Sequence, residues 1–219
     1  MNVAITLLIP FLGTVVGAST VLMARKAIGA RVNKALLGFA AGVMVAASVW
    51  SLIIPAIDLS ADMGRLSWLP AAGGIILGML FLLALDSLVP HLHPNGSEPE
   101  GVRSSLGRRP MLMLAVTLHN IPEGMAVSVP LISGGMGKTK AVLITALSGV
   151  PTIVGALLGY LIGEIGPMGL ALSLGFASGA MLYVVFGEIL PQAILMYHSK
   201  LPAFSAIAGI LVGVLIIFG

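Results

Sequence analysis

The pattern of apolar and polar positions divides the chain into long apolar runs joined by short polar connections. A helix needs about 20 apolar residues to cross a bilayer. Seven runs approach this length, and each predicts a transmembrane helix: Val3–Ala24, Ala35–Ile57, Trp68–Leu88, Met111–Ile132, Ala141–Ile162, Met168–Met196 and Ala203–Phe218. The predicted fold is therefore an all-α polytopic membrane bundle, with residues 1–219 forming a single domain.

The composition excludes the class of soluble globular proteins. The chain is 58% hydrophobic and 9% charged, with a mean hydropathy of +1.10. It has no cysteine, so disulfides and thiolate ligands are excluded. The net charge of +3 comes from basic residues between the spans rather than from one patch, so the predicted partner is the lipid bilayer and not nucleic acid.

The distribution of Lys and Arg predicts an unusual topology. The first basic residues follow the first apolar run, which favours an uncleaved first span with its N-terminus outside. Strict alternation of seven spans would place seven of the eleven basic residues inside and four outside. An even number of crossings in the central region would place ten inside and only Arg65 outside. The positive-inside rule favours the even number.

An internal repeat supports the same topology. The segment LGFAAGVM (Leu37–Met44) recurs as LGFASGAM (Leu174–Met181), 137 residues later, and Ala56 and Ala193 keep that spacing. With an even number of central crossings the two copies run in opposite directions, as in inverted-repeat transporters that bind substrate between their halves. Small residues shared by packed membrane helices are the alternative explanation. The repeat and the charges together favour descent from an eight-span protein.

The segment Leu112–Val129 (LMLAVTLHNIPEGMAVSV) contains polar groups in the middle of an apolar run. An ionisable side chain at this depth costs roughly 2.5–3.5 kcal/mol on insertion scales. His119 and Glu123 are four residues apart and share one face of a helix, and Asn120 lies about 100° round. Pro122 leaves the carbonyl of Leu118 without a donor, and Gly124 loosens the next turn.

These residues predict a metal-ion site in a transport path. Imidazole nitrogen with carboxylate and amide oxygen suits Zn(II), Fe(II), Mn(II) or Co(II). The structural alternative is a buried His119–Glu123 pair that holds two helices together.

Other candidate groups carry weaker signals. Glu188, near Pro191, is a candidate ion relay or an interfacial helix cap, and Asp86 near a span end favours the cap. His91 and His93 begin a polar, predicted cytoplasmic loop over residues 91–109, where they either capture metal or are simply solvated. The remaining acidic residues in short connections could form an outer funnel for cations: Asp58, Asp62 and Glu164.

The motif HNIPEGMAV, with LDSLVPHLH and GAMLYVVFGEILP in the same order, resembles the ZIP (Zrt-, Irt-like) divalent metal transporters, in particular their GufA-like bacterial branch. The resemblance implies eight spans and uptake of zinc and similar ions toward the cytoplasm. It also implies that His119, Asn120 and Glu123 are ligands on the fourth helix and that Glu188 lies toward the cytoplasmic exit.

The chain departs from the family pattern at the site. It has one PEG-containing helix where the family has two, and SVPLISGGMGKTKA follows directly like the end of the family's fifth helix. An internal deletion that fuses the fourth and fifth helices would explain this and the charge pattern. Thr152 stands where the family has a Glu, and Gly187 where some members have a His.

The predicted function is a permease for divalent metal ions, above all zinc, in the inner or plasma membrane. No prosthetic group is predicted, and the sequence leaves open whether the protein forms a homodimer. A transport-defective metal-binding protein that partners an intact transporter is the alternative. An intramembrane metallohydrolase is disfavoured because HNIPE lacks the second His of HExxH, so no enzymatic activity is predicted.

Overall fold

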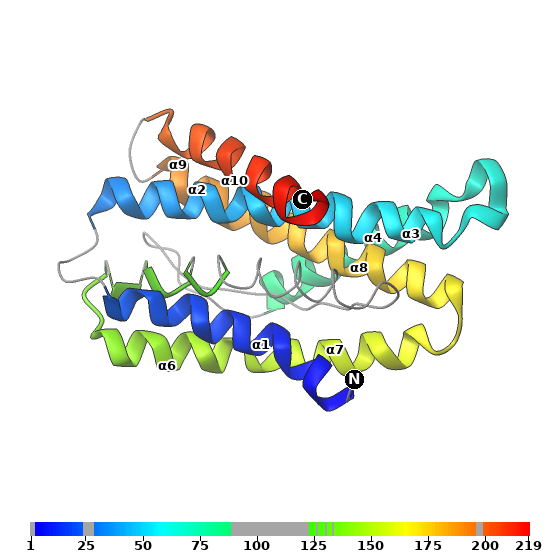
Figure 1. The fold of residues 1–219 in the computed structure, drawn as a ribbon, viewed down its shortest axis with the longest axis horizontal. Coiled ribbons are helices and arrows are strands. Elements are labelled where there is room, and N and C mark those ends of the chain that lie inside the picture. Colours follow the sequence, from blue (N-terminus) through cyan, green and yellow to red (C-terminus); the bar gives the residue numbers. More distant parts are fainter. Residues whose placement is uncertain are drawn as a thin grey trace.

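The computed structural model describes residues 3–23, 29–88, 123–125, 127–129, 131–132, 134–195 and 199–219, and this part of the chain contains helices and no strand (Figure 1). The elements are α1 (Val3–Ser19), η1 (Thr20–Met23), α2 (Ala30–Ala46), η2 (Ala47–Ile53), α3 (Ile54–Asp58), η3 (Ala61–Leu66), α4 (Trp68–Leu88), α6 (Lys138–Ser148), α7 (Val150–Gly163), α8 (Pro167–Val184), η4 (Val185–Ile189), α9 (Leu190–Leu195) and α10 (Leu201–Phe218). The all-α prediction is confirmed.

Four described helical stretches are long and apolar enough to cross a membrane: Arg31–Asp58, Lys138–Gly163, Pro167–Ile194 and Leu201–Phe218. Two shorter apolar stretches, Leu8–Met23 and Trp68–Ala84, accompany them. Six of the seven predicted spans therefore have helical counterparts, and α4 has the predicted bounds. Most of the other predicted span, Met111–Ile132, lies outside the described residues.

The internal repeat is present in the backbone. Ala30 begins α2 and Pro167 begins α8, and these positions are 137 residues apart. Asp58 ends α3 and Leu195 ends α9, at the same spacing. Each copy thus contains one long helical rod with a π-helical segment, η2 or η4, at the equivalent place.

Each π-helical segment ends next to a proline. The N–H of Ile54 donates to the carbonyl of Val49, five residues back, and the N–H of Leu190 donates to that of Val185 in the same way. Pro55 and Pro191 come directly after these donors, and a proline offers no N–H and clashes with the preceding turn of an α-helix. We attribute the widened turns to these prolines, since π turns occur as local bulges inside α-helices.

The two rods cross in opposite directions (Figure 1). The beginning of the first rod, α2, packs against η4 and α9, which end the second, while α8 packs against η2 and α3. At the crossing, the Ser178 hydroxyl donates to the carbonyl of Ser48 at 3.4 Å. The inverted repeat predicted from the sequence is therefore confirmed.

Close backbone contacts at glycines interlock the two copies. The helix that follows each rod packs on the other rod: α4, which follows the first rod, packs on α8, and α10, which follows the second rod, packs on α2. A Cβ at Gly78 would overlap the carbonyl of Phe176, and a Cβ at Gly209 would overlap the carbonyl of Phe39. Phe39 and Phe176 are equivalent positions of the repeat, 137 residues apart. These glycines let the backbones approach, as small residues do between membrane helices.

A second layer contains α1, α6 and α7, and its Lys138–Gly163 stretch is less buried than the two rods of the repeat. The α1 helix packs against α6 and α7, and α7 connects to α8 through a turn in which Gly166 has a φ of 137°. Only 28% of the most apolar stretch of Lys138–Gly163 is buried inside the protein, against 67% for Arg31–Asp58 and 61% for Pro167–Ile194.

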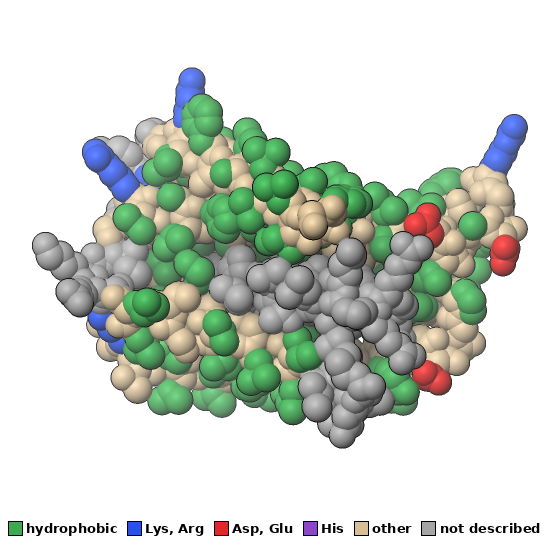
Figure 2. Space-filling view, viewed as in Figure 1, with side chains coloured by type: hydrophobic (Ala, Val, Ile, Leu, Met, Phe, Trp, Pro, Cys, Tyr) green, Lys and Arg blue, Asp and Glu red, His purple; other side chains and the backbone are tan. Residues whose placement is uncertain are grey.

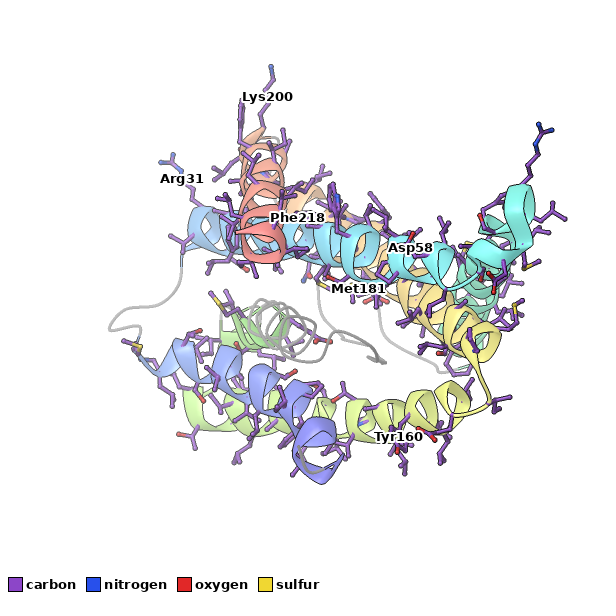
Figure 3. All side chains as sticks on the ribbon, turned by 45° about the vertical axis from the view of Figure 1, so that its right-hand side comes forward. Arg31, Asp58, Tyr160, Met181, Lys200 and Phe218 are labelled. Atoms are coloured by element: carbon purple, nitrogen blue, oxygen red, sulfur yellow. The ribbon has the colours of Figure 1, made fainter. Side chains whose placement is uncertain are left out.

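Charged side chains gather at opposite ends of the bundle (Figure 2). Arg31 and Lys200 lie at one end, and Asp58 lies toward the other (Figure 3). The first turn of α6, with Lys138 and Lys140, belongs to the basic end because α6 packs against η1, the end of α1. The positive-inside rule predicts that the basic end faces the cytoplasm.

The chain leaves α4 and enters α6 at this same basic end. The α4 helix runs parallel to α8, because a Cβ at Gly74 would meet Leu172 and a Cβ at Gly78 would meet Ala180 further along. The α8 helix starts at the acidic end, so Leu88 ends α4 at the basic end. Leu88 and Lys138 therefore lie at the same end of the bundle, in agreement with the charge pattern.

Candidate metal site

The structure describes two of the four predicted metal ligands. Glu123 and Glu188 are described and half-buried, whereas His119 and Asn120 lie outside the described residues. His91, His93 and Pro122 lie outside them too, and Asp86 is placed in α4 without a described side chain. Among the described residues no group of three metal-ligating side chains occurs. The complete ligand set stays a prediction.

The glycine that follows Glu123 lies directly against α1. Residues 123–125 are helical, and a Cβ at Gly124 would overlap the carbonyl of Thr14 and approach the backbone nitrogen of Ala18. Gly124 was predicted to loosen its turn, and the structure gives it a packing role as well. The glycine of the PEG motif fixes how closely the Glu123 helix approaches α1.

Thr14 of α1 also contacts Gly149, the residue that joins α6 to α7. It is 2% exposed, and a Cβ at Gly149 would come within 3.3 Å of the side chains of Thr14 and Phe11. Glu123, next to Gly124, and Thr152, three residues beyond Gly149, are thereby brought to the same region of α1.

Thr152 stands where the resemblance implies a carboxylate. Its side chain is 2% exposed, and its hydroxyl donates to the carbonyl of Gly149 at 2.6 Å. The hydroxyl proton is thus used in a hydrogen bond within the same helix, and a neutral threonine oxygen is a weaker cation ligand than a carboxylate. This side of the site contributes packing and no negative charge.

Glu188 belongs to the other layer and lies in the π-helical segment η4. A carboxylate beside a backbone break was predicted here from Pro191, and the break is the widened turn. π turns recur at functional sites because they redirect a side chain from its α-helical phase. Glu188 follows the crossing point at Ser178 toward the basic end, which places it on the predicted cytoplasmic side of the membrane centre.

Several buried polar atoms have no hydrogen-bond partner among the described residues, and sequence reasoning did not single them out. They include the hydroxyl oxygens of Ser48 and Ser128 and the Nε2 of Gln192. The signal that could have found them is a polar residue inside a predicted span. Serine and threonine are common in such spans, so only the glutamine stands out from that background.

Residues 101–219 match the family described as ZIP zinc transporter. This chain belongs to the ZIP family. It is 32% identical to zinc transporter ZIPB of Bordetella bronchiseptica, over 91% of this chain and 75% of ZIPB. It is also 32% identical to zinc transporter GufA of Myxococcus xanthus, over 66% of this chain and 70% of GufA. Zinc transporter ZupT of Salmonella arizonae is 27% identical over 79% of each chain.

The alignments with ZIPB and GufA contain the same total of positions that have no counterpart in this chain. The alignment with ZIPB has 232 positions but includes 91% of 219 residues, about 199, so about 33 positions have no counterpart here. The same arithmetic gives about 33 positions for GufA, from 178 aligned positions and 66% of the chain. A transmembrane helix with its connection is of this length. The unmatched total in these two alignments is long enough for the predicted loss of one helix.

Proposed function

We propose that this ZIP-family protein moves zinc into the cytoplasm through a site at His119, Asn120 and Glu123, with Glu188 on the exit side. Family membership gives the general class, a membrane transporter of metal ions whose named relatives are zinc transporters and not enzymes. The inverted repeat carries the proposal, because inverted-repeat transporters bind their ion at the interface between repeats. Zinc is the substrate, and Fe, Mn and Co are further candidates with the same ligand preferences.

The two ends of the bundle support the inward direction. Glu188 lies between the crossing point and the basic end, and the basic end faces the cytoplasm by the positive-inside rule. The exposed acidic residues Asp58, Asp62 and Glu164 lie in connections at the opposite end, where they attract cations. The membrane is then the inner or plasma membrane of the cell.

Zinc uptake into proteoliposomes with a trapped zinc indicator tests the proposal. We expect wild type to exceed empty vesicles and His119→Ala and Glu123→Ala to fall about tenfold or more, the scale of 1.4 kcal/mol for a lost ligand. Ser199→Ala, at an exposed position in the α9–α10 connection, is the matched control and should equal wild type. Uptake by the two ligand variants at the wild-type rate would refute the site.

A second candidate function rests on the missing length. The end of α4 and the start of α6 lie at one end of the bundle, and about 33 positions of ZIPB have no counterpart in this chain. Loss of a helix from the metal-binding layer would leave a protein that binds zinc but does not move it, as a partner of an intact transporter or of a second copy. Equilibrium zinc binding that depends on His119, together with uptake equal to empty vesicles, would favour this function.

A further inference from the structure

Gln192 is the only glutamine in the chain, and it lies in α9 near the basic end of the bundle. Its side chain is half-buried, and its Nε2 is buried without a hydrogen-bond partner among the described residues. A buried amide group without a partner costs about 1–3 kcal/mol, so such a group is a candidate for a ligand that is bound only part of the time.

The two ends of an amide have the same shape, so the buried position can be occupied by oxygen as well as by nitrogen. With the oxygen there, Gln192 presents an acceptor with no donor, and a divalent cation satisfies such an acceptor. An amide oxygen is a neutral ligand of the kind that hard and borderline metal ions accept beside a carboxylate.

The carboxylate is one turn away. Glu188 and Gln192 are four residues apart across the junction of η4 and α9, so their side chains leave the helix on the same side. The equivalent positions of the first copy, 137 residues earlier, are Ser51 and Pro55, which offer neither a charge nor an amide. The pair is therefore a property of the second copy alone and is not required by the repeated fold.

The opposite rod adds a positive charge at this level. Lys34 lies in the first turns of α2, the helix that packs against η4 and α9. Lys34 is 2% exposed. An ammonium group near a bound cation lowers its affinity, which suits a position from which the ion has to leave.

We propose that Gln192 is an uncharged ligand of an exit-side cation site that it shares with Glu188, and that its missing charge keeps this site weak enough for release. The proposal rests on the proposed function, since it assigns a further residue to the same ion path. A carboxylate at position 192 would hold the ion, and an apolar side chain would lose one ligand. Gln192→Glu and Gln192→Leu therefore change zinc binding in opposite directions.

The test measures equilibrium zinc binding to the purified full chain in detergent. We expect Gln192→Glu to bind zinc about tenfold more tightly, equivalent to 1.4 kcal/mol, and Gln192→Leu to bind about threefold more weakly. In a Glu188→Ala background, both changes should shrink to less than twofold, because the two side chains act on one ion. Ser199→Glu adds the same charge at an exposed position of the same end and should leave binding unchanged.

Several outcomes overturn the proposal. Equal binding by Gln192→Leu and wild type would exclude Gln192 as a ligand. A gain in Gln192→Glu that survives Glu188→Ala, or that Ser199→Glu reproduces, would mean that added charge attracts zinc without a shared site. Proteoliposome flux separates this question from the proposed function: if wild type moves no zinc, transport fails, while the binding cycle still decides the role of Gln192.

Discussion

The two copies of the repeat have the same backbone and different chemistry. The rod of the second copy begins and ends 137 residues after that of the first, and both rods contain a π-helical segment at the equivalent place, η2 in the first and η4 in the second. In the second copy this turn carries Glu188, followed by Gln192, whereas the first copy has Ser51 and Pro55. Copies that fold alike thus differ at the positions for which we propose a role in ion transfer.

Residues that agree between the copies lie where the copies touch. Gly42 and Gly179 both meet a backbone carbonyl of a helix from the other copy, Ala206 and Ile75 respectively. Agreement between copies therefore identifies packing, and disagreement identifies candidates for function.

The largest expected effect is an all-or-none difference in the side of the membrane that each connection faces. The chain has no cysteine, so single cysteines at the exposed positions Ala61, Thr139 and Ser199 can be labelled cleanly. In intact cells, an impermeant maleimide should label Ala61→Cys only, and Thr139→Cys and Ser199→Cys should react only after permeabilisation. Labelling of Thr139→Cys together with Ala61→Cys would mean that the copies are not inverted.

The next largest effect is on stability at the interlocking glycines. A Cβ at Gly42 or Gly179 would overlap a backbone carbonyl that no rotamer change can move. We expect Gly42→Ala and Gly179→Ala to destabilise the protein by about 1–3 kcal/mol each, the usual range for overpacking. Thermal unfolding in detergent measures both variants, and similar losses are expected because the contacts are equivalent.

Gly73→Ala is the matched control for this pair. Its Cβ would meet only the Leu172 side chain at 3.9 Å, although its neighbour Gly74 faces the Leu172 carbonyl. Alanine should be neutral there or stabilise the helix by up to about 1 kcal/mol. If Gly73→Ala lowered the free energy of unfolding as much as Gly42→Ala, any added methyl group would disturb these helices. The specific role of the close glycine contacts would then be refuted.

Much of this fold was predictable because bilayer length and repetition both leave local signals. The bounds of α4 match the prediction, and LGFAAGVM with LGFASGAM gave the spacing at which the two rods begin and end. The packing of α4 on α8 and of α10 on α2 was not predictable. It depends on which glycine of α4 meets which carbonyl of α8, and these residues are a hundred positions apart in the sequence.

The candidate site was less predictable than the fold. Pro191 indicated a backbone break beside Glu188, but a proline does not specify whether the helix kinks or widens into a π turn. The role of Gly124 in fixing the distance to Thr14 depends on a neighbouring helix that no local pattern identifies. His119 and Asn120 lie outside the described residues, so their part of the site stays a prediction.

A smaller effect is expected from the equivalent positions in the two π turns. Glu188→Gln removes a negative charge from the exit side, and we expect zinc uptake to fall about tenfold. Ser51→Ala, 137 residues earlier, removes only a buried hydroxyl and should lower uptake less than about threefold. Equal losses for the two variants would mean that the copies share the transport chemistry as well as the fold.

The smallest effect concerns the hydrogen bond at the crossing of the rods. Ser178 donates to the Ser48 carbonyl at 3.4 Å, a long distance for an O–H donor, and both residues are buried. Interhelical hydrogen bonds in membranes average about 0.6 kcal/mol, so Ser178→Ala should cost no more than that in unfolding experiments. Ser173→Ala, which loses a 3.0 Å bond within its own helix, should cost less still, because the Leu170 carbonyl keeps its place in the helix. A loss above about 2 kcal/mol at Ser178 would exceed what one such bond contributes, and the crossing would then depend on polar pairing at this point rather than on the glycine contacts that the two copies share.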